Sequence, residues 1–147
     1  MIDSINAHGT STPIADLAEA NFIKPLIGNN DTWDNLKAFR AIDYNKCLGM
    51  IKVRLSKLAK PVITAQKGHI GNAICAAGAI ESIFAILSIR DGVIPNIRNL
   101  KEPLDGDLNF AKENVKKPVN VVLKNSLSFG GVNVALVFKA YNEESKL

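Results

Sequence analysis

The chain has 147 residues, which is the length of one domain, and 47% of them are hydrophobic while 22% are charged. This composition excludes a disordered tail, and no apolar run is long enough to span a membrane. The two cysteines, Cys47 and Cys75, form neither a disulfide framework nor a zinc-binding pattern, so we expect a reducing compartment. A net charge of +4 permits an acidic partner without indicating nucleic-acid binding.

The spacing of apolar residues predicts alternating strands and helices along the chain. A strand at 2–7 leads into a helix at 14–27, and because that strand opens at residue 2, we expect the chain to start inside a domain. The later elements are a segment rich in Lys and Arg at 32–60, a strand at 61–65, a helix at 73–90, a long connection at 96–117, and strands at 119–124 and 133–140. This order is typical of an α/β or α+β fold.

Three loops carry the candidate site residues, because function on such sheets gathers in loops beyond strand ends. His8 follows the first strand directly, and the adjacent Gly9 favours an imidazole held in position for proton transfer near neutral pH. Thr10 and Thr12 supply hydroxyl groups suited to a ligand that carries an amide. The alternatives are a histidine bonded to backbone and an ordinary Ser/Thr turn. The three loops are 8–13, 67–72 and 125–132.

The second and third loops offer groups that can donate hydrogen bonds to a carbonyl oxygen or bind an anion. The second places Lys67 and Asn72 just before a helix N-terminus, although a surface turn explains the same residues. In the third, Phe129 precedes Gly130 and Gly131, two residues that adopt positive φ without strain. Backbone N–H groups exposed there form an oxyanion hole in one interpretation and part of a glycine-rich hairpin in the other.

Taken together, the three loops resemble the signatures of one family, the β-ketoacyl-acyl carrier protein synthases. The matching stretches are 6–13 with Asp16 and Glu19, then Lys67, Gly71 and 76–81, and finally 125–133. They follow the family order over residues 2–140, and only 32–60 lacks a counterpart. We therefore expect an incomplete C-terminal β-ketoacyl synthase domain over 1–147, with a basic insertion at about 32–60.

The resemblance implies an α/β, thiolase-like fold, of which this chain matches most of the C-terminal half, a mixed sheet with packed helices. The implied activity is that of a 3-oxoacyl-[acyl-carrier-protein] synthase, the decarboxylative Claisen condensation of an acyl thioester with malonyl-acyl carrier protein in fatty-acid synthesis. No cofactor is expected to be bound, because the carrier protein delivers the phosphopantetheine arm. The implied partners are acyl carrier protein, malonyl and acyl thioesters and a second subunit in a homodimer, with no nucleic acid and no membrane span.

The resemblance also implies roles for residues that match the family motifs. The implied catalytic residues are His8, Lys67, Asn72 at the second-histidine position, and Phe129 as gate and oxyanion-hole donor. The implied substrate-binding residues are Thr10, Thr12, Gly130 and Gly131. The positions that surround a buried structural cation in some members are Asn6, Glu19, Glu81 and Asn125. A buried carboxylate needs a partner but not a metal, so Lys67 or Lys124 replaces the cation in the alternative interpretation.

Two departures from the family pattern bear on activity. The nucleophilic cysteine of the family belongs to the half of the fold that this chain does not resemble, and neither Cys47 nor Cys75 lies in its context. We expect Cys75 to be a small core residue. Asn72 stands where elongating members have their second histidine, which predicts weaker enolate stabilisation because an amide donates a hydrogen bond but carries no positive charge.

These departures leave two interpretations open. In the first, the chain is the C-terminal part of a synthase of fatty-acid or polyketide assembly, and on its own we expect it to be inactive and poorly stable or oligomeric, because a helix face with Ile80, Ile83, Phe84 and Ile86 would be exposed. In the second, it is a non-catalytic relative or partner subunit that binds acyl carrier protein. A general thiolase relative is disfavoured, because thiolases place a cysteine in the last glycine-rich loop.

Two further expectations concern the partner and the compartment. The basic segment 32–60 is a candidate docking surface for the acidic carrier protein, with a merely solvated segment as the alternative. The run that begins at Lys67 favours a mitochondrial enzyme, with the cytoplasm as the alternative.

Overall fold

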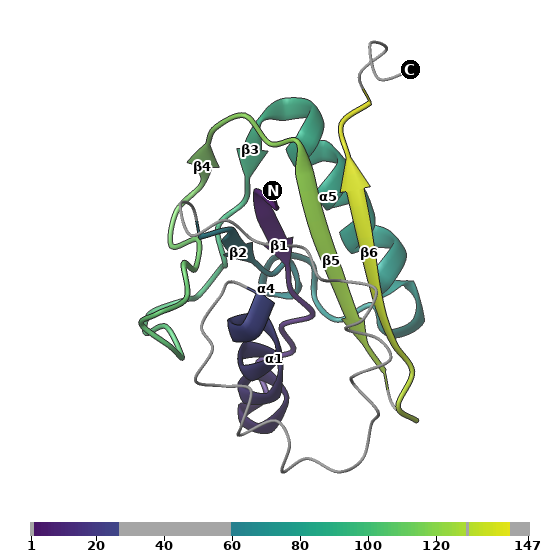
Figure 1. The fold of residues 1–147 in the computed structure, drawn as a ribbon. Helices are drawn as coiled ribbons and strands as arrows, with labels where there is room; N and C mark the ends of the chain where they lie inside the picture. The colour runs from purple at the N-terminus through teal and green to yellow at the C-terminus, as the bar shows by residue number, and fades with distance from the viewer. Residues whose placement is uncertain (1, 27–59, 129, 142–147) are drawn as a thin grey trace.

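The computed structural model describes residues 2–26, 60–128 and 130–141. They form a four-stranded sheet in the order β2-β1-β5-β6 and a two-stranded ribbon, β3-β4 (Figure 1). The strands are β1 (Ser4–Asn6), β2 (Val62–Thr64), β3 (Val93–Ile94), β4 (Val115–Lys116), β5 (Val121–Leu127) and β6 (Asn133–Lys139). The helices are α1 (Pro13–Leu26), α4 (Lys67–Ile70) and α5 (Ala77–Asp91), with a 3₁₀ turn at Ile74–Ala76. Across these described ranges, no helix combines the length and apolar character needed to cross a bilayer.

The sheet is mixed, as the sequence predicts. The short strand β1 lies in its middle and runs parallel to both β2 and β5, while β6 pairs with β5 in the antiparallel sense. The register places Asn6 between Thr64 on β2 and Lys124 on β5. Three polar side chains therefore lie in one row across the sheet.

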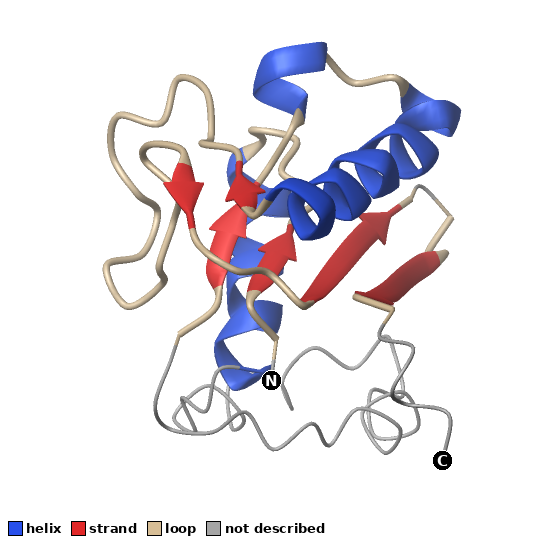
Figure 2. Ribbon diagram, turned by 90° about the horizontal axis from the view of Figure 1, so that it is seen from above, coloured by secondary structure: helices blue, strands red, loops and turns tan. Residues whose placement is uncertain are grey.

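Helix α1 covers one face of the sheet and α5 covers the other (Figure 2). On the α1 face, Ile5, Ile63 and Leu123 of the three parallel strands pack with Ala20 and Ile23 of the helix. Because the middle of the sheet is covered on both faces, successive residues of β1 and β2 are all buried, the polar ones included.

The α5 face combines an apolar cluster with the polar row. Val62 and Val122 pack with Ala85 of α5, and the row that contains Asn6 and Lys124 follows further along the same strands. All of these side chains are buried. The polar groups in this layer must therefore find their partners within the protein.

Part of the apolar surface of α5 stays exposed in the chain. Ile83 is 56% exposed and Ile86 is 49% exposed, whereas Ile80 and Phe84 are half-buried. The predicted exposed apolar face is therefore present, but only two of its four residues, Ile83 and Ile86, are exposed. The expected poor stability or oligomerisation of the chain stays a prediction.

The structure corrects several predicted boundaries. The helix predicted at 73–90 begins at Ala77, because Ile74 has a φ of +48° and the segment before the helix is a 3₁₀ turn. The strand predicted at 119–124 continues to Leu127, because β6 pairs with it that far. The turn predicted at 67–72 contains α4, and the ribbon β3-β4 was missed because each strand has only two residues.

The expectation for Cys75 is wrong. This thiol is exposed, because Cys75 lies on the 3₁₀ turn ahead of α5 rather than on the buried face of the helix. Cys47, Phe129 and, apart from Lys60, the basic segment 32–60 lie outside the described residues.

Candidate active site

The loop that follows β1 is held by one buried carboxylate. Glu19 on α1 is 5% exposed, and its two oxygens accept the backbone N–H groups of His8 at 2.7 Å and Gly9 at 2.9 Å. Burial raises the pKa of the Glu19 carboxyl, and the two N–H donors act in the opposite direction. Gly9 has a φ of +49°, and a Cβ there would lie 2.6 Å from the Cβ of Ala65. The loop therefore needs a glycine at this position and holds His8 in place.

The hydroxyl groups predicted to bind substrate lie together on the same loop. The Oγ1 atoms of Thr10 and Thr12 are 3.2 Å apart. Between them, Ser11 has a φ of +61°, and its N–H donates to Oδ1 of Asp16 at 3.1 Å. A non-glycine residue with positive φ marks a strained turn, and here Asp16 stabilises it.

Lys67 joins the second loop to the first. Its Nζ lies 2.6 Å from the carbonyl oxygen of His8, 3.2 Å from Nδ1 of the same histidine and 2.5 Å from Oε1 of Glu81. An ammonium group can only donate, so Nδ1 of His8 accepts and its ring proton lies on Nε2. The histidine therefore keeps an Nε2–H group to donate to a ligand.

The surroundings of His8 favour the neutral ring. Burial is the largest cause that lowers its pKa, the positive charges of Lys67 and Lys124 lower it further, and Glu81 opposes them. A neutral imidazole with its proton on Nε2 can donate one hydrogen bond to a ligand at pH 7.

Glu81 is the centre of a buried charge cluster on the α5 face. Its side chain is fully buried; Oε1 contacts Lys67, and Oε2 lies 2.7 Å from Nζ of Lys124. Nζ of Lys124 also contacts the carbonyl oxygen of Asn125 and lies 3.1 Å from Oγ of Ser126. Burial lowers the pKa of Lys124, and Glu81 opposes that shift. Asn6 completes the cluster, donating from Nδ2 to the carbonyl oxygen of Glu81 at 3.1 Å.

The four residues implied to surround a structural cation do not fit one. Both oxygens of Glu81 face ammonium groups, and both oxygens of Glu19 accept backbone N–H groups. Oδ1 of Asn6 and the whole amide of Asn125 are buried without a hydrogen-bond partner, but neither brings a negative charge. The described ranges contain no group of three or more His, Cys, Asp or Glu side chains suited to a metal.

Asn72 and His69 do not contact His8. Asn72 is exposed, and its Oδ1 accepts the N–H of Ile74 at 3.1 Å. His69 places Nε2 at 2.9 Å from the carbonyl oxygen of Asn96. The expected role of Asn72 is to donate to a ligand oxygen, and that role stays a prediction. In the third loop, Gly130 and Gly131 have positive φ, as predicted, and are exposed.

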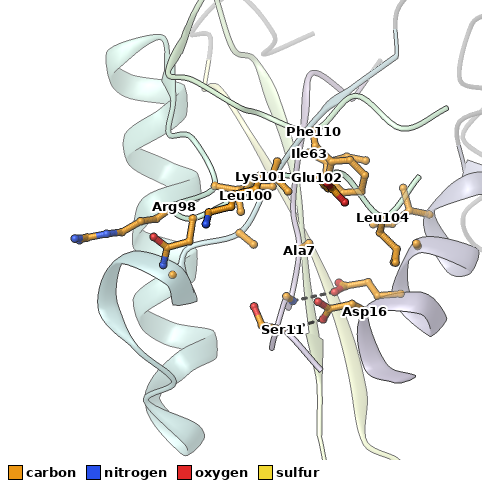
Figure 3. Close-up of a pocket in the computed structure, with 18 residues that line it drawn as sticks. Ala7, Ser11, Asp16, Ile63, Arg98, Leu100, Lys101, Glu102, Leu104 and Phe110 are labelled. Atoms are coloured by element: carbon orange, nitrogen blue, oxygen red, sulfur yellow. Dashed lines mark hydrogen bonds between the residues drawn. The ribbon is translucent and has the colours of Figure 1, made fainter. Parts of the chain in front are cut away.

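A cavity of about 500 Å³ lies beside the first loop (Figure 3). Ser11 and Asp16 line one part of it, and residues 97–102 line another. His8 and Lys67 do not line this cavity, although Ala7 and Gly9, the neighbours of His8, do.

Lys124 is the buried charged residue that the sequence identified least clearly. In the sequence it is one of two alternatives to a cation, and the structure shows that both lysines contact the same carboxylate. The signal in the sequence is a lysine that directly follows the apolar run of 121–123 within a predicted strand. Such a lysine is buried only when it is paired.

Comparison with known families agrees with this site. The sequence profile described as "Beta-ketoacyl synthase, C-terminal domain" matches residues 1–47 and 48–101, which is well over half of the chain. The chain belongs to the β-ketoacyl synthase family. The match includes the loops that carry His8 and Lys67, and it includes Glu81.

Relatives at the sequence level are bacterial condensing enzymes. The chain is 35% identical over 138 residues to a 3-oxoacyl-[acyl-carrier-protein] synthase 2 of Coxiella burnetii, covering 92% of this chain. It is 33% identical over 143 residues to the enzyme of the same description from Mycobacterium leprae, covering 95% of this chain. In both cases it spans only 27% of the length of the relative.

Solved ketosynthase structures share the fold. The ishigamide ketosynthase/chain length factor superposes with a TM-score of 0.69 at 28% identity, over 96% of this chain and 28% of that one. A second match is the AntDE:AntF structure, described as a type II PKS acyl-carrier protein in complex with its ketosynthase bound to the hexaketide. It superposes with a TM-score of 0.69 at 26% identity, over 95% of this chain and 28% of that one. The thiolase-like α/β fold expected from the sequence is thereby confirmed.

Proposed function

We propose that this chain supplies the malonyl-binding part of a 3-oxoacyl-[acyl-carrier-protein] synthase. The observation that carries the proposal is the pairing of Lys67 with Nδ1 of His8, which leaves Nε2–H as the donor. Membership in the β-ketoacyl synthase family and likeness to two 3-oxoacyl-[acyl-carrier-protein] synthases support it.

In the proposed reaction, Nε2–H of His8 donates to the thioester carbonyl oxygen of the malonyl group. As the bond to the carboxylate breaks and CO₂ leaves, its electron pair moves onto the α-carbon and that oxygen, and the hydrogen bond stabilises the enolate. The α-carbon then attacks the carbonyl of the acyl thioester, and the acyl-bearing thiolate leaves. That thiol belongs to a part of the synthase that this chain does not match.

A second donor for the same oxygen comes from Asn72. Its Oδ1 accepts the N–H of Ile74, which orients the amide and directs Nδ2 as the donor. An amide carries no positive charge, so we expect a weaker contribution to enolate stabilisation than a histidine would make. The backbone N–H of Phe129 is proposed to serve the oxyanion of the acyl thioester.

Substrate delivery is proposed to depend on acyl carrier protein. The adjacent hydroxyls of Thr10 and Thr12, 3.2 Å apart at the surface of the His8 loop, suit the amides of a phosphopantetheine arm. The solved complex of a ketosynthase with its acyl-carrier protein among the structural relatives supports this partner. We also propose that no cofactor binds permanently to this chain.

The second candidate function is that of a non-catalytic subunit that binds acyl carrier protein. Asn72 at the second-histidine position favours it, because an amide cannot carry the positive charge of a histidine. The two functions differ in one measurable step, the loss of CO₂ from malonyl-acyl carrier protein.

The test measures CO₂ release from malonyl-acyl carrier protein by this chain complemented with the nucleophile-bearing part of the synthase, and every variant is compared in that complemented form. We expect His8→Ala to abolish release, because the enolate loses its donor, while His69→Gln retains it, because that ring bonds Asn96 outside the site. Carrier-protein binding without CO₂ release by the unmodified protein would support the non-catalytic function and refute the synthase. Unchanged release by His8→Ala would refute the role of His8.

A further inference from the structure

We propose that the side chain of Lys124 takes the place of a structural cation in this protein, as an ammonium group that is permanently attached to the sheet. The proposal concerns the architecture beside the site and does not depend on the activity proposed above. It rests on the burial of Lys124, on its contacts and on the charge of the cluster around Glu81.

The burial of Lys124 requires a specific partner. The residue is 1% exposed, and it is the largest fully buried side chain of the described residues. Moving an ammonium group out of water costs several kcal/mol unless close contacts compensate for it. Its Nζ lies 2.7 Å from Oε2 of Glu81 and is near two further oxygens, the carbonyl of Asn125 and Oγ of Ser126. A set of oxygens around one positive centre is also how a protein binds a monovalent metal ion.

The charges of the cluster already cancel. Its buried ionisable groups are Glu81, Lys67 and Lys124, and buried Glu19 of α1 is near enough for its charge to act on Lys124, so two acidic groups balance two basic ones. A metal ion added beside Glu81 would bring a third positive charge to a carboxylate that two ammonium groups already contact. Because an uncompensated buried charge is strongly unfavourable, the cluster excludes the ion while Lys124 is present.

The register of the sheet explains how the side chain of Lys124 can reach the position of a structural cation. Lys124 lies beside Asn6 on the neighbouring strand, and Asn6 donates to the backbone of Glu81 on the helix above. The lysine therefore projects from the centre of the sheet into the layer between the sheet and α5. A tethered ammonium holds this position at any salt concentration, whereas a bound ion would be lost when its concentration falls.

The experiment compares thermal unfolding of the purified protein in KCl, NaCl and choline chloride at equal ionic strength. Choline is too large to enter the layer, so it reports general salt effects alone. We expect the midpoint of the unmodified protein to be the same in all three salts. A midpoint that falls when choline replaces K⁺ or Na⁺ would overturn the proposal, because a bound metal ion would then be contributing.

The decisive variant is Lys124→Ser, which removes the ammonium group and leaves space and an oxygen. We expect a lower midpoint in choline chloride and a saturable rise as KCl or NaCl replaces it. Lys124→Met fills the same space and should stay destabilised in every salt. The matched control is Lys139→Ser on the exposed edge strand β6, for which no salt-specific change is expected.

Loss of stability in Lys124→Ser without salt-specific recovery would show that Lys124 is an ordinary ion-pair partner, and it would overturn the proposal. If Lys124→Ser does not fold in choline chloride, the yield of folded protein on adding KCl replaces the midpoint as the readout. Recovery then supports the proposal, and failure to recover refutes it.

Discussion

Replacing Gly9 with alanine tests how tightly the His8 loop is packed against β2. The new Cβ would lie 2.6 Å from the Cβ of Ala65, whereas carbon atoms in contact are about 3.5–4.0 Å apart. Overpacking of this kind costs about 1–3 kcal/mol. The φ of +49° adds about 1–2 kcal/mol for a residue with a side chain. We therefore expect Gly9→Ala to lower the free energy of unfolding by about 2–5 kcal/mol.

Two other glycines separate the contributions. Gly130 has a φ of +85° and open space around its Cβ position, so Gly130→Ala should cost only the backbone contribution of about 1–2 kcal/mol. Gly106 has open space and no positive φ, so Gly106→Ala should leave stability unchanged or slightly raised. The expected order of destabilisation is Gly9 first, then Gly130, then Gly106.

Urea unfolding followed by far-UV circular dichroism measures these differences. Gly9→Ala should also weaken CO₂ release, because the displaced loop carries His8. If Gly9→Ala is no less stable than Gly130→Ala, then the loop does not pack against Ala65, and the explanation of how His8 is held is wrong.

Two further predictions concern charges at the site. Glu81→Gln leaves two buried ammonium groups without a counter-charge, so it should lower the free energy of unfolding in urea by about 3–5 kcal/mol. The control, Glu102→Gln at an exposed position, should lower it by almost nothing. Equal losses of stability in the two variants would contradict the buried cluster. Folding lowers the pKa of His8 below 6.5, so its contribution to stability is complete above that pH and is lost as the pH falls toward the folded-state pKa. His8→Gln should therefore unfold with a weaker pH dependence than the unmodified protein below pH 6.5, with His69→Gln as the control; parallel profiles would contradict this.

Much of the fold could be predicted because its helices and parallel strands have strong local patterns. Helix α1 is predicted at 14–27 and found at Pro13–Leu26, since its apolar residues recur at helical spacing. The ends of β5 and α5 could not be predicted in this way. β5 extends because of its antiparallel partner β6, and α5 starts late because of the positive φ of Ile74, which no local pattern of the sequence reveals.

The site, like the fold, could be predicted where local motifs define it and not where packing between distant elements does. The loop motifs identify His8 and Lys67, and the structure places Nζ of Lys67 3.2 Å from Nδ1 of His8. The sharing of Glu81 by two lysines could not be predicted, because it depends on how α5 is rotated over the sheet. Asn72 matches a family position in sequence, yet it bonds to Ile74 rather than to His8.

The central position of β1 has a consequence for how the chain folds during synthesis. Its partners are β2 and β5, and Asp3, just before β1, accepts the N–H of Val121, 118 positions along the chain. Of the described strands a ribosome makes β1 first, so this strand stays without its β5 partner until nearly all the described residues have emerged. Folds with such long-range pairing form slowly and expose apolar strands in the meantime. We therefore expect the yield of folded protein to increase with slower translation or lower growth temperature.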